Sequence, residues 1–88
     1  MKEFESVWDA IEDTPAEAEN MKVRAQLMRE IERVIRESAW SQAEAARRLG
    51  LTQPRISDLL RGKVDLFSVD KLINILAAAG KTIEMRAA

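Results

Sequence analysis

Cysteine and histidine are both absent from this chain of 88 residues. Without cysteine the chain cannot form a disulfide bond or a thiolate metal site, and without histidine it cannot build a His-based catalytic triad. Only three glycines are present, and they form no glycine-rich loop of the kind that cradles phosphate groups. Paired carboxylates and a nucleophile beside a base are missing too. The sequence therefore predicts a protein that is not an enzyme and that uses no cofactor or metal ion.

Apolar runs of membrane length are also missing, and no signal peptide opens the chain. We therefore expect a protein of the cytoplasm or the nucleoid, with no membrane partner. The composition, 47% hydrophobic and 33% charged, is typical of a folded globular domain. A domain of this size has a thin core, so association with a second copy would add stability.

Charge is divided unevenly along the chain, although the net charge is only −1. Residues 1–19 carry seven acidic groups and one lysine, whereas residues 20–88 carry thirteen basic and eight acidic groups. This division indicates an acidic leader attached to a basic body that faces DNA. The alternative is that both are ordinary solvated surfaces.

Two short helices joined by a tight turn are predicted within residues 41–62. Ser41 and Glu44 have the spacing of a capping box, in which the serine hydroxyl accepts from the Glu44 N–H and the Glu44 side chain accepts from the Ser41 N–H. Gly50 supplies the left-handed conformation that ends the first helix. Thr52 is then the N-cap of the second helix.

The second of these helices has an inner and an outer face. Because Pro54 lacks an N–H, Thr52 is expected to accept from the N–H of Arg55. The apolar side chains fall together on the inner face: Ile56, Leu59 and Leu60. Hydrogen-bonding side chains in the first turns suit insertion into a DNA major groove. The candidate DNA contacts are Gln42, Thr52, Gln53, Pro54, Arg55, Ser57, Asp58, Arg61 and Lys63.

Several of these candidates have distinct chemical roles. The planar amide of Gln53 can match adenine, and the Arg55 fork can reach guanine O6 and N7 or a phosphate. Asp58 can accept from a cytosine amine, but an intramolecular pair with Arg55 or Arg61 is an open alternative because phosphates repel a carboxylate. Arg61 and Lys63 bracket the following turn, where basic groups can meet phosphates. Ordinary exposed helix surface is the alternative for every candidate.

The stretch resembles the helix-turn-helix of the lambda-repressor/Cro-like (Xre) family. The matching positions are Gln42, Ala46, Gly50, Ile56 and Leu59. The resemblance implies that Gln42 binds a phosphate and steadies Gln53. Pro54 departs from the family pattern because relatives often carry a polar base reader there. This leaves apolar contact, for example with a thymine methyl group.

A wider resemblance, over roughly residues 4–86, is to small HigA-type antitoxins and related Xre regulators. The stretches that carry it are DTPAEAENMKVRAQLM, SQAEAARRLGLTQPRISDLLRGKVDLFSVDKL and TIEMR. It implies an all-α, lambda-repressor-like domain of about five helices with a short C-terminal β-strand. It also implies a repressor of its own operon that acts as the antitoxin of a RelE-like ribonuclease toxin. The alternatives are a stand-alone Xre regulator without a toxin, or a protein-binding adaptor without DNA affinity.

The leader, residues 1–13, is expected to form a short amphipathic helix. Its apolar side chains recur at helical spacing: Phe4, Val7, Trp8 and Ile11. A helix this short does not persist alone in water. Its apolar face is therefore expected to bind the protein's own core, a second subunit or a basic partner protein such as a toxin.

The DNA-binding domain, residues 14–80, contains two further predicted helices. One starts at a second capping box, Thr14 and Glu17, and runs to about Ser38 unless Asn20 restarts it. Its expected buried stripe is Val23, Leu27, Met28, Ile31, Val34 and Ile35. Its expected basic surface is Arg24, Arg29, Arg33 and Arg36. The other runs from the N-cap Ser68 to Gly80 and packs inward Leu72, Ile73, Leu76 and Ala79. Trp40 is expected to pack into the core, and stacking on a DNA base is the alternative.

The tail, residues 81–88, alternates like a β-strand. One strand in a helical domain needs a mate, which the same segment of a second subunit would supply across a two-fold axis. Ile83 and Met85 are the expected dimerisation residues, and pairing with the leader or simple disorder are the alternatives. A homodimer would place two Gln53 helices ~34 Å apart on a palindromic operator in double-stranded DNA.

Overall fold

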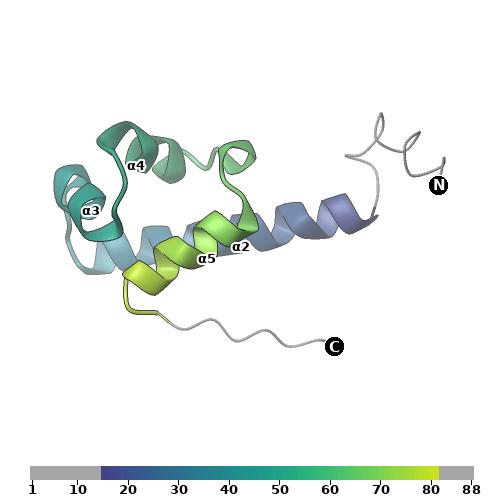
Figure 1. Cartoon of the computed structure of the whole chain (residues 1–88), viewed down its shortest axis with the longest axis horizontal. Helices are drawn as coiled ribbons and strands as arrows, with labels where there is room; N and C mark the ends of the chain where they lie inside the picture. The colour runs from purple at the N-terminus through teal and green to yellow at the C-terminus, as the bar shows by residue number, and fades with distance from the viewer. Residues whose placement is uncertain (1–14, 82–88) are drawn as a thin grey trace.

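The computed structural model describes residues 15–81, and these form four α-helices and one short 3-10 helix, without a strand. In chain order the elements are α2 (Pro15–Glu37), α3 (Gln42–Leu49), α4 (Gln53–Leu60), η2 (Val64–Leu66) and α5 (Val69–Ala78). Figure 1 shows α2 as the long base of the domain, with α5 alongside it and α3 and α4 over its C-terminal half. The predicted all-α class is confirmed for these residues.

Three sequence predictions fall outside the described residues. They are the leader helix with Phe4, Val7, Trp8 and Ile11, the Thr14 cap, and the C-terminal strand with Ile83 and Met85. Each stays a prediction. Among the described helices, none combines the length and the apolar character that a membrane span requires.

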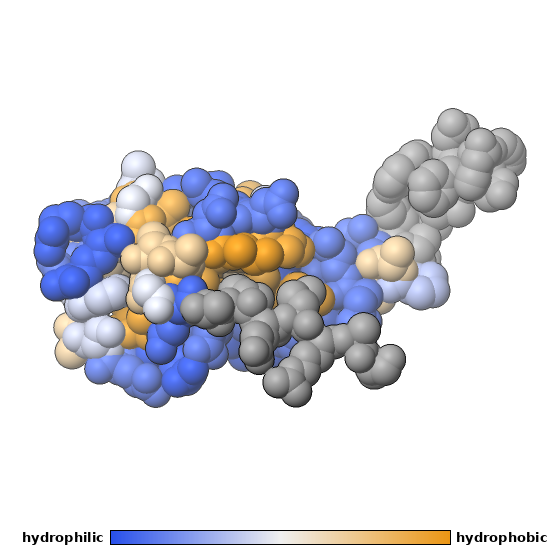
Figure 2. All heavy atoms as spheres, turned by 60° about the horizontal axis from the view of Figure 1, so that its bottom comes forward, coloured by the Kyte–Doolittle hydropathy of each residue, from blue (hydrophilic) through white to orange (hydrophobic). Residues whose placement is uncertain are grey.

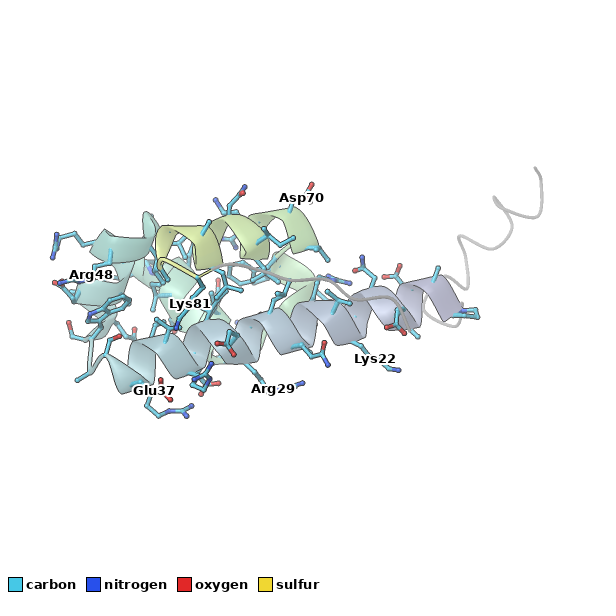
Figure 3. The ribbon with its side chains drawn as sticks, turned by 90° about the horizontal axis from the view of Figure 1, so that it is seen from below. Lys22, Arg29, Glu37, Arg48, Asp70 and Lys81 are labelled. Carbon is cyan, nitrogen blue, oxygen red and sulfur yellow. The ribbon has the colours of Figure 1, made fainter. Side chains whose placement is uncertain are left out.

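The long helix α2 is continuous, so Asn20 does not restart it. Its fully buried side chains are Met28, Ile31, Val34 and Ile35. Val23 and Leu27, which were expected in the same stripe, are only half-buried. Figure 3 shows Lys22, Arg29 and Glu37 projecting from α2 on the side away from α5. The helix therefore has one apolar side and one charged side.

The core joins all four helices. Phe67, Ile31, Ile56, Leu59, Leu72, Ile75 and Leu76 are its largest fully buried side chains. Trp40 is half-buried and packs against the core, as expected. In α5 the prediction needs one correction, because Ile75 is fully buried whereas Ile73 is half-buried. Ala79, the C-cap of this helix, is half-buried and packs against the core, as expected. Side chains at positions 72, 75 and 76 share one side of the helix, and position 73 lies on its flank.

The described surface is not uniformly polar. Figure 2 brings the side with α2 and α5 toward the viewer and shows an apolar band between two hydrophilic regions. Half-buried apolar residues occur on both helices, including Val23 and Leu27 on α2 and Val69 and Ile73 on α5. Some apolar side chains of α2 and α5 therefore stay partly exposed, because the described core does not cover them completely.

Ala39, two residues after the end of α2, adopts a backbone conformation that favours glycine. Ala39 has φ 57°, and its N–H bonds the Arg36 carbonyl while the Trp40 N–H bonds the Ile35 carbonyl, both at 3.1 Å. A left-handed conformation costs a non-glycine residue roughly 1–2 kcal/mol. Ala39→Gly should therefore raise the free energy of unfolding by about 0.5–1 kcal/mol, since relief of strain exceeds the added chain entropy. Urea unfolding followed by circular dichroism measures this change.

A matched alanine inside the same helix provides the control. Ala18 is exposed on α2, and Ala18→Gly should cost about 1 kcal/mol because glycine disfavours a helix interior. A similar loss for Ala39→Gly would contradict strain at the end of α2.

Candidate functional site

The site is built on the turn that joins α3 to α4. Ser41 caps α3 by accepting from the Glu44 N–H at 3.1 Å. Gly50 ends this helix with φ 71°, and Thr52 caps α4 by accepting from the Arg55 N–H at 3.4 Å. These three local predictions are confirmed. The two helices then pack through small and aliphatic side chains, the buried ones being Ala45, Ala46, Leu49, Ile56 and Leu59.

The second half of the predicted capping box does not form. The Glu44 carboxylate accepts instead from Arg47 Nη2 and Arg48 Nε, both at 2.5 Å. Two charged donors on the next turn of α3 bind a carboxylate more strongly than the neutral Ser41 N–H does. As a result, Arg47 and Arg48 share one carboxylate within α3, which offsets one of their two positive charges.

These bonds make the pairing at Glu44 dependent on pH. Hydrogen bonds from Arg47, and then from Arg48, hold the pKa of Glu44 below its ordinary value of 4.5. A carboxyl group with a lowered folded-state pKa stabilises the fold above its unfolded-state pKa, and this contribution is lost as pH falls through the folded-state pKa. Glu44→Gln should therefore be less stable than the natural chain at pH 7. Thermal unfolding should show the difference shrinking as pH falls below 4.5. A difference that stays constant down to low pH would contradict this.

The N-terminal ends of the two helices carry exposed polar groups. Gln42 is the first residue of α3 and Gln53 the first of α4. Both are exposed, as are Thr52 and Pro54. Within residues 15–81, neither glutamine side chain has an intramolecular hydrogen bond. Both amides are therefore available to a ligand.

The remaining α4 candidates differ in exposure. Ser57 and Asp58 are half-buried, and Arg61 and Lys63 are exposed. Asp58 pairs with Lys63, with Nζ and Oδ1 3.5 Å apart, rather than with either predicted arginine. Gly62, at φ 75°, turns the chain back so that the Lys63 N–H bonds the Asp58 carbonyl at 3.1 Å. This return of the chain brings the Lys63 side chain to Asp58.

Arg55 is half-buried and has partners within the protein. Its Nη2 donates to the Leu66 carbonyl at 3.1 Å. Its guanidinium carbon lies 4.7 Å from the centre of the Phe67 ring. Within residues 15–81, this one bond leaves the other N–H groups of the guanidinium without a hydrogen-bond partner, so base reading by Arg55 must use those groups or break the bond to Leu66.

One important residue was misassigned by sequence reasoning. Arg24 was expected on a basic surface, yet its side chain is only 11% exposed and donates to the loop after α4. A signal was present, because Arg24, Met28 and Ile31 follow the i, i+4, i+7 spacing of one helix face. Of the other three arginines of α2, Arg33 and Arg36 pair with glutamates on the same helix. The basic surface of α2 is therefore smaller than predicted.

Comparison with known proteins adds one match. The model of a protein family described as a helix-turn-helix domain matches residues 10–88. No curated protein matches the chain. The match spans most of the chain and includes α3, the turn and α4.

Proposed function

The chain belongs to this helix-turn-helix domain family, and from that premise we propose that it is a sequence-specific transcriptional repressor. Helix-turn-helix domains bind DNA by placing their second helix in the major groove. Here that helix is α4, which we call the recognition helix. The observation that carries the proposal is the exposed N-terminal end of α4, where the Gln53 amide has no intramolecular partner in the described chain.

Within this proposal the candidate residues have separate tasks. Gln53 reads a base edge, and Gln42 contacts a phosphate and steadies Gln53. Pro54 offers apolar contact to a thymine methyl group. Arg61 and Lys63 are exposed beyond the end of α4 and contact phosphates. Thr52 and Ser57 supply further hydroxyl groups, while Asp58 mainly orients Lys63.

More specifically, we propose that the protein is an antitoxin that represses its own operon and acts as a homodimer. Two recognition helices related by a two-fold axis would fit a palindromic operator. We assign dimerisation to the tail with Ile83 and Met85, and partner binding to the acidic leader with its apolar face. The partner would be a RelE-like toxin. These assignments are supported by the sequence resemblance, and the runner-up is a stand-alone regulator without a toxin.

DNA binding measured by fluorescence anisotropy tests the repressor proposal. The probes are the DNA upstream of the protein's own gene and a scrambled duplex, each at several salt concentrations. We expect tight binding to the first and weaker, steeply salt-dependent binding to the second. Gln53→Ala should weaken binding to the first probe by about 1–3 kcal/mol while leaving the scrambled probe almost unaffected. Equal, weak binding to both probes by the natural chain would refute sequence-specific repression by way of this site.

A second experiment tests the antitoxin assignment. The protein is co-expressed with the product of the adjacent gene, and the pair is purified through a tag on that product. Co-purification that is lost when residues 1–13 are deleted would support partner binding by the leader. Independent elution of the two proteins would favour the stand-alone regulator. DNA binding by the deletion variant controls for the fold of the remaining domain.

A further inference from the structure

The loop between α4 and α5 is held by arginine side chains from two different helices. Arg24 of α2 donates from Nη1 to the carbonyl oxygens of Val64 and Phe67, at 2.9 and 3.4 Å. Arg55 of α4 donates to the Leu66 carbonyl at 3.1 Å. The loop includes η2, which has no side-chain cap of its own. The side chains that donate hydrogen bonds to the carbonyl groups of this loop therefore belong to α2 and α4.

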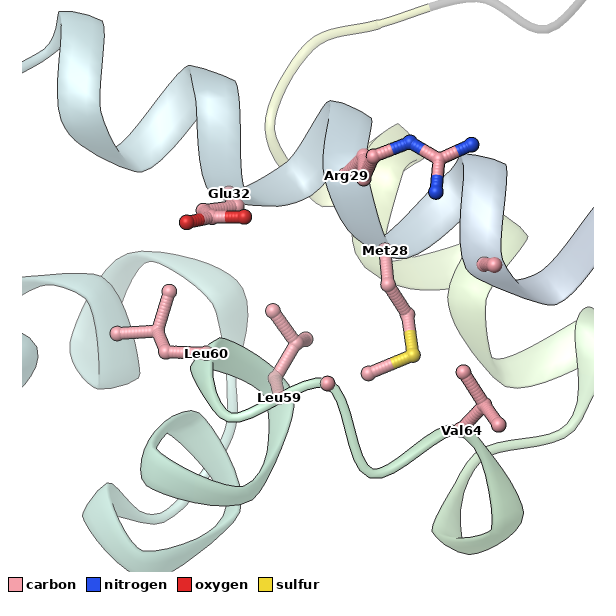
Figure 4. Close-up of a pocket in the computed structure, with 8 residues that line it drawn as sticks. Met28, Arg29, Glu32, Leu59, Leu60 and Val64 are labelled. Atoms are coloured by element: carbon pink, nitrogen blue, oxygen red, sulfur yellow. The ribbon is translucent and has the colours of Figure 1, made fainter.

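Apolar packing between the loop and α2 is incomplete. A half-open surface pocket of about 190 Å³ lies between α2 and the end of α4 with its following loop. Met28 lines it on the α2 side, Leu59 and Leu60 on the α4 side, and Gly62 and Val64 on the loop side. Figure 4 shows Met28 reaching from α2 toward Val64 across this opening. Beside this opening, the hydrogen bonds of Arg24 join the loop to α2. They add to the contacts that Phe67 and Val64 make with the core.

The Arg24 side chain suits this task but has no direct access to DNA. It is 11% exposed, and its Nη2 lies 3.6 Å from a Glu17 carboxylate oxygen. Its Nε is buried without a hydrogen-bond partner in the described chain. Burying a guanidinium costs free energy. The bonds of Arg24 to the two loop carbonyls and its ion pair with Glu17 offset this cost. A lysine is a point donor and would not reproduce bonds to both the loop carbonyls and Glu17.

We propose that Arg24 is a positioning residue for DNA binding, which holds the loop so that Lys63 meets a backbone phosphate. The proposal rests on the function proposed above. Lys63 directly precedes η2 and is exposed, and its N–H bonds Asp58 on the recognition helix at 3.1 Å. A charge-assisted bond to phosphate requires an N···O distance of about 2.7–2.9 Å. Without Arg24 the loop keeps Phe67 in the core but loses its hydrogen bonds to α2 at Val64 and Phe67. A small shift of the loop is then enough to lose that distance.

A double-mutant cycle tests the proposal. Arg24→Met, Lys63→Met and the double variant are compared with the natural chain by anisotropy at several salt concentrations, at a temperature where circular dichroism shows each to be folded. For the natural chain, log K falls as log salt concentration rises. Each single variant should make this fall less steep by about 0.9 units of slope, which corresponds to the loss of one phosphate contact. The loss should be the same on operator and scrambled DNA. The salt dependence of the double variant should be as steep as that of either single variant, since both changes remove the same contact.

Two further variants sharpen the test. Arg24→Lys keeps the charge but loses the fork, so it should lower the slope as Arg24→Met does. Arg33→Met removes one charge from the exposed side of α2 and should leave the slope unchanged. The positioning role would be overturned if Arg24→Met had the same salt dependence as the natural chain, or if the effects of Arg24→Met and Lys63→Met on the slope simply added in the double variant. Either result would leave the proposed function intact. Absence of salt-dependent DNA binding by the natural chain would overturn both.

Discussion

Phe67→Ala should lower the free energy of unfolding by about 3–5 kcal/mol. The Phe67 side chain is 1% exposed and is the largest of the fully buried side chains. It lies between η2 and α5, where it joins the loop to the common core. Small domains have total stabilities of about 5–15 kcal/mol, so this one change would remove a large share. Urea unfolding followed by circular dichroism measures the loss.

The neighbouring leucine provides a matched control. Leu66 is 45% exposed, so Leu66→Ala should change stability by less than about 0.5 kcal/mol. The substitution keeps the Leu66 carbonyl that Arg55 binds, and it therefore isolates the effect of side-chain burial. Equal losses in the two variants would contradict the placement of Phe67 in the core.

Arg55→Ala should weaken both the fold and DNA binding. Loss of the bond to the Leu66 carbonyl and of the contact with the Phe67 ring should lower the free energy of unfolding by about 1–2 kcal/mol. If Arg55 also reads a base, affinity for the operator should fall by about 1–3 kcal/mol, with a smaller loss on scrambled DNA. Chemical unfolding and anisotropy on the same samples separate the two effects.

Arg48 is the matched control for Arg55. Its guanidinium also lies over an aromatic ring, 5.0 Å from the centre of Trp40, but it belongs to α3 and binds Glu44. Arg48→Ala should show no sequence-dependent loss of DNA affinity. If Arg55→Ala weakens operator and scrambled DNA equally, Arg55 does not read bases. Such a uniform loss would indicate a phosphate contact by Arg55, or support of the loop that carries Lys63.

The capped ends of the helices were predictable because each is decided within a few residues. Ser41 and Thr52 accept from the expected N–H groups, at 3.1 and 3.4 Å. Ser68 is an N-cap as expected and accepts from the Lys71 N–H at 3.1 Å. Gly50 adopts the expected left-handed conformation. The exposed Gln42 and Gln53 follow directly from these helix starts, so the outer side of the candidate site was predictable as well.

The partners of long side chains were not predictable in the same way. Asp58 pairs with Lys63 because Gly62 turns the chain back. Arg24 reaches carbonyl oxygens that lie 40 and 43 residues further along the chain. Such contacts depend on how the helices pack, and no local spacing encodes them.

The sequence by itself determined the all-α class, the helix-turn-helix spacing and the polar end of α4, because hydrogen-bond caps, glycine conformations and apolar periodicity act over short stretches. Only the tertiary structure decided which charged groups remain open to DNA. Packing of α2 against the loop after α4 buries Arg24 and turns it into a support for that loop. Packing of Phe67 beneath Arg55 gives that guanidinium a partner inside the protein. Local sequence does not show whether an arginine is free to contact DNA or bonds within the protein. That depends on which carbonyl groups the fold places close to its guanidinium.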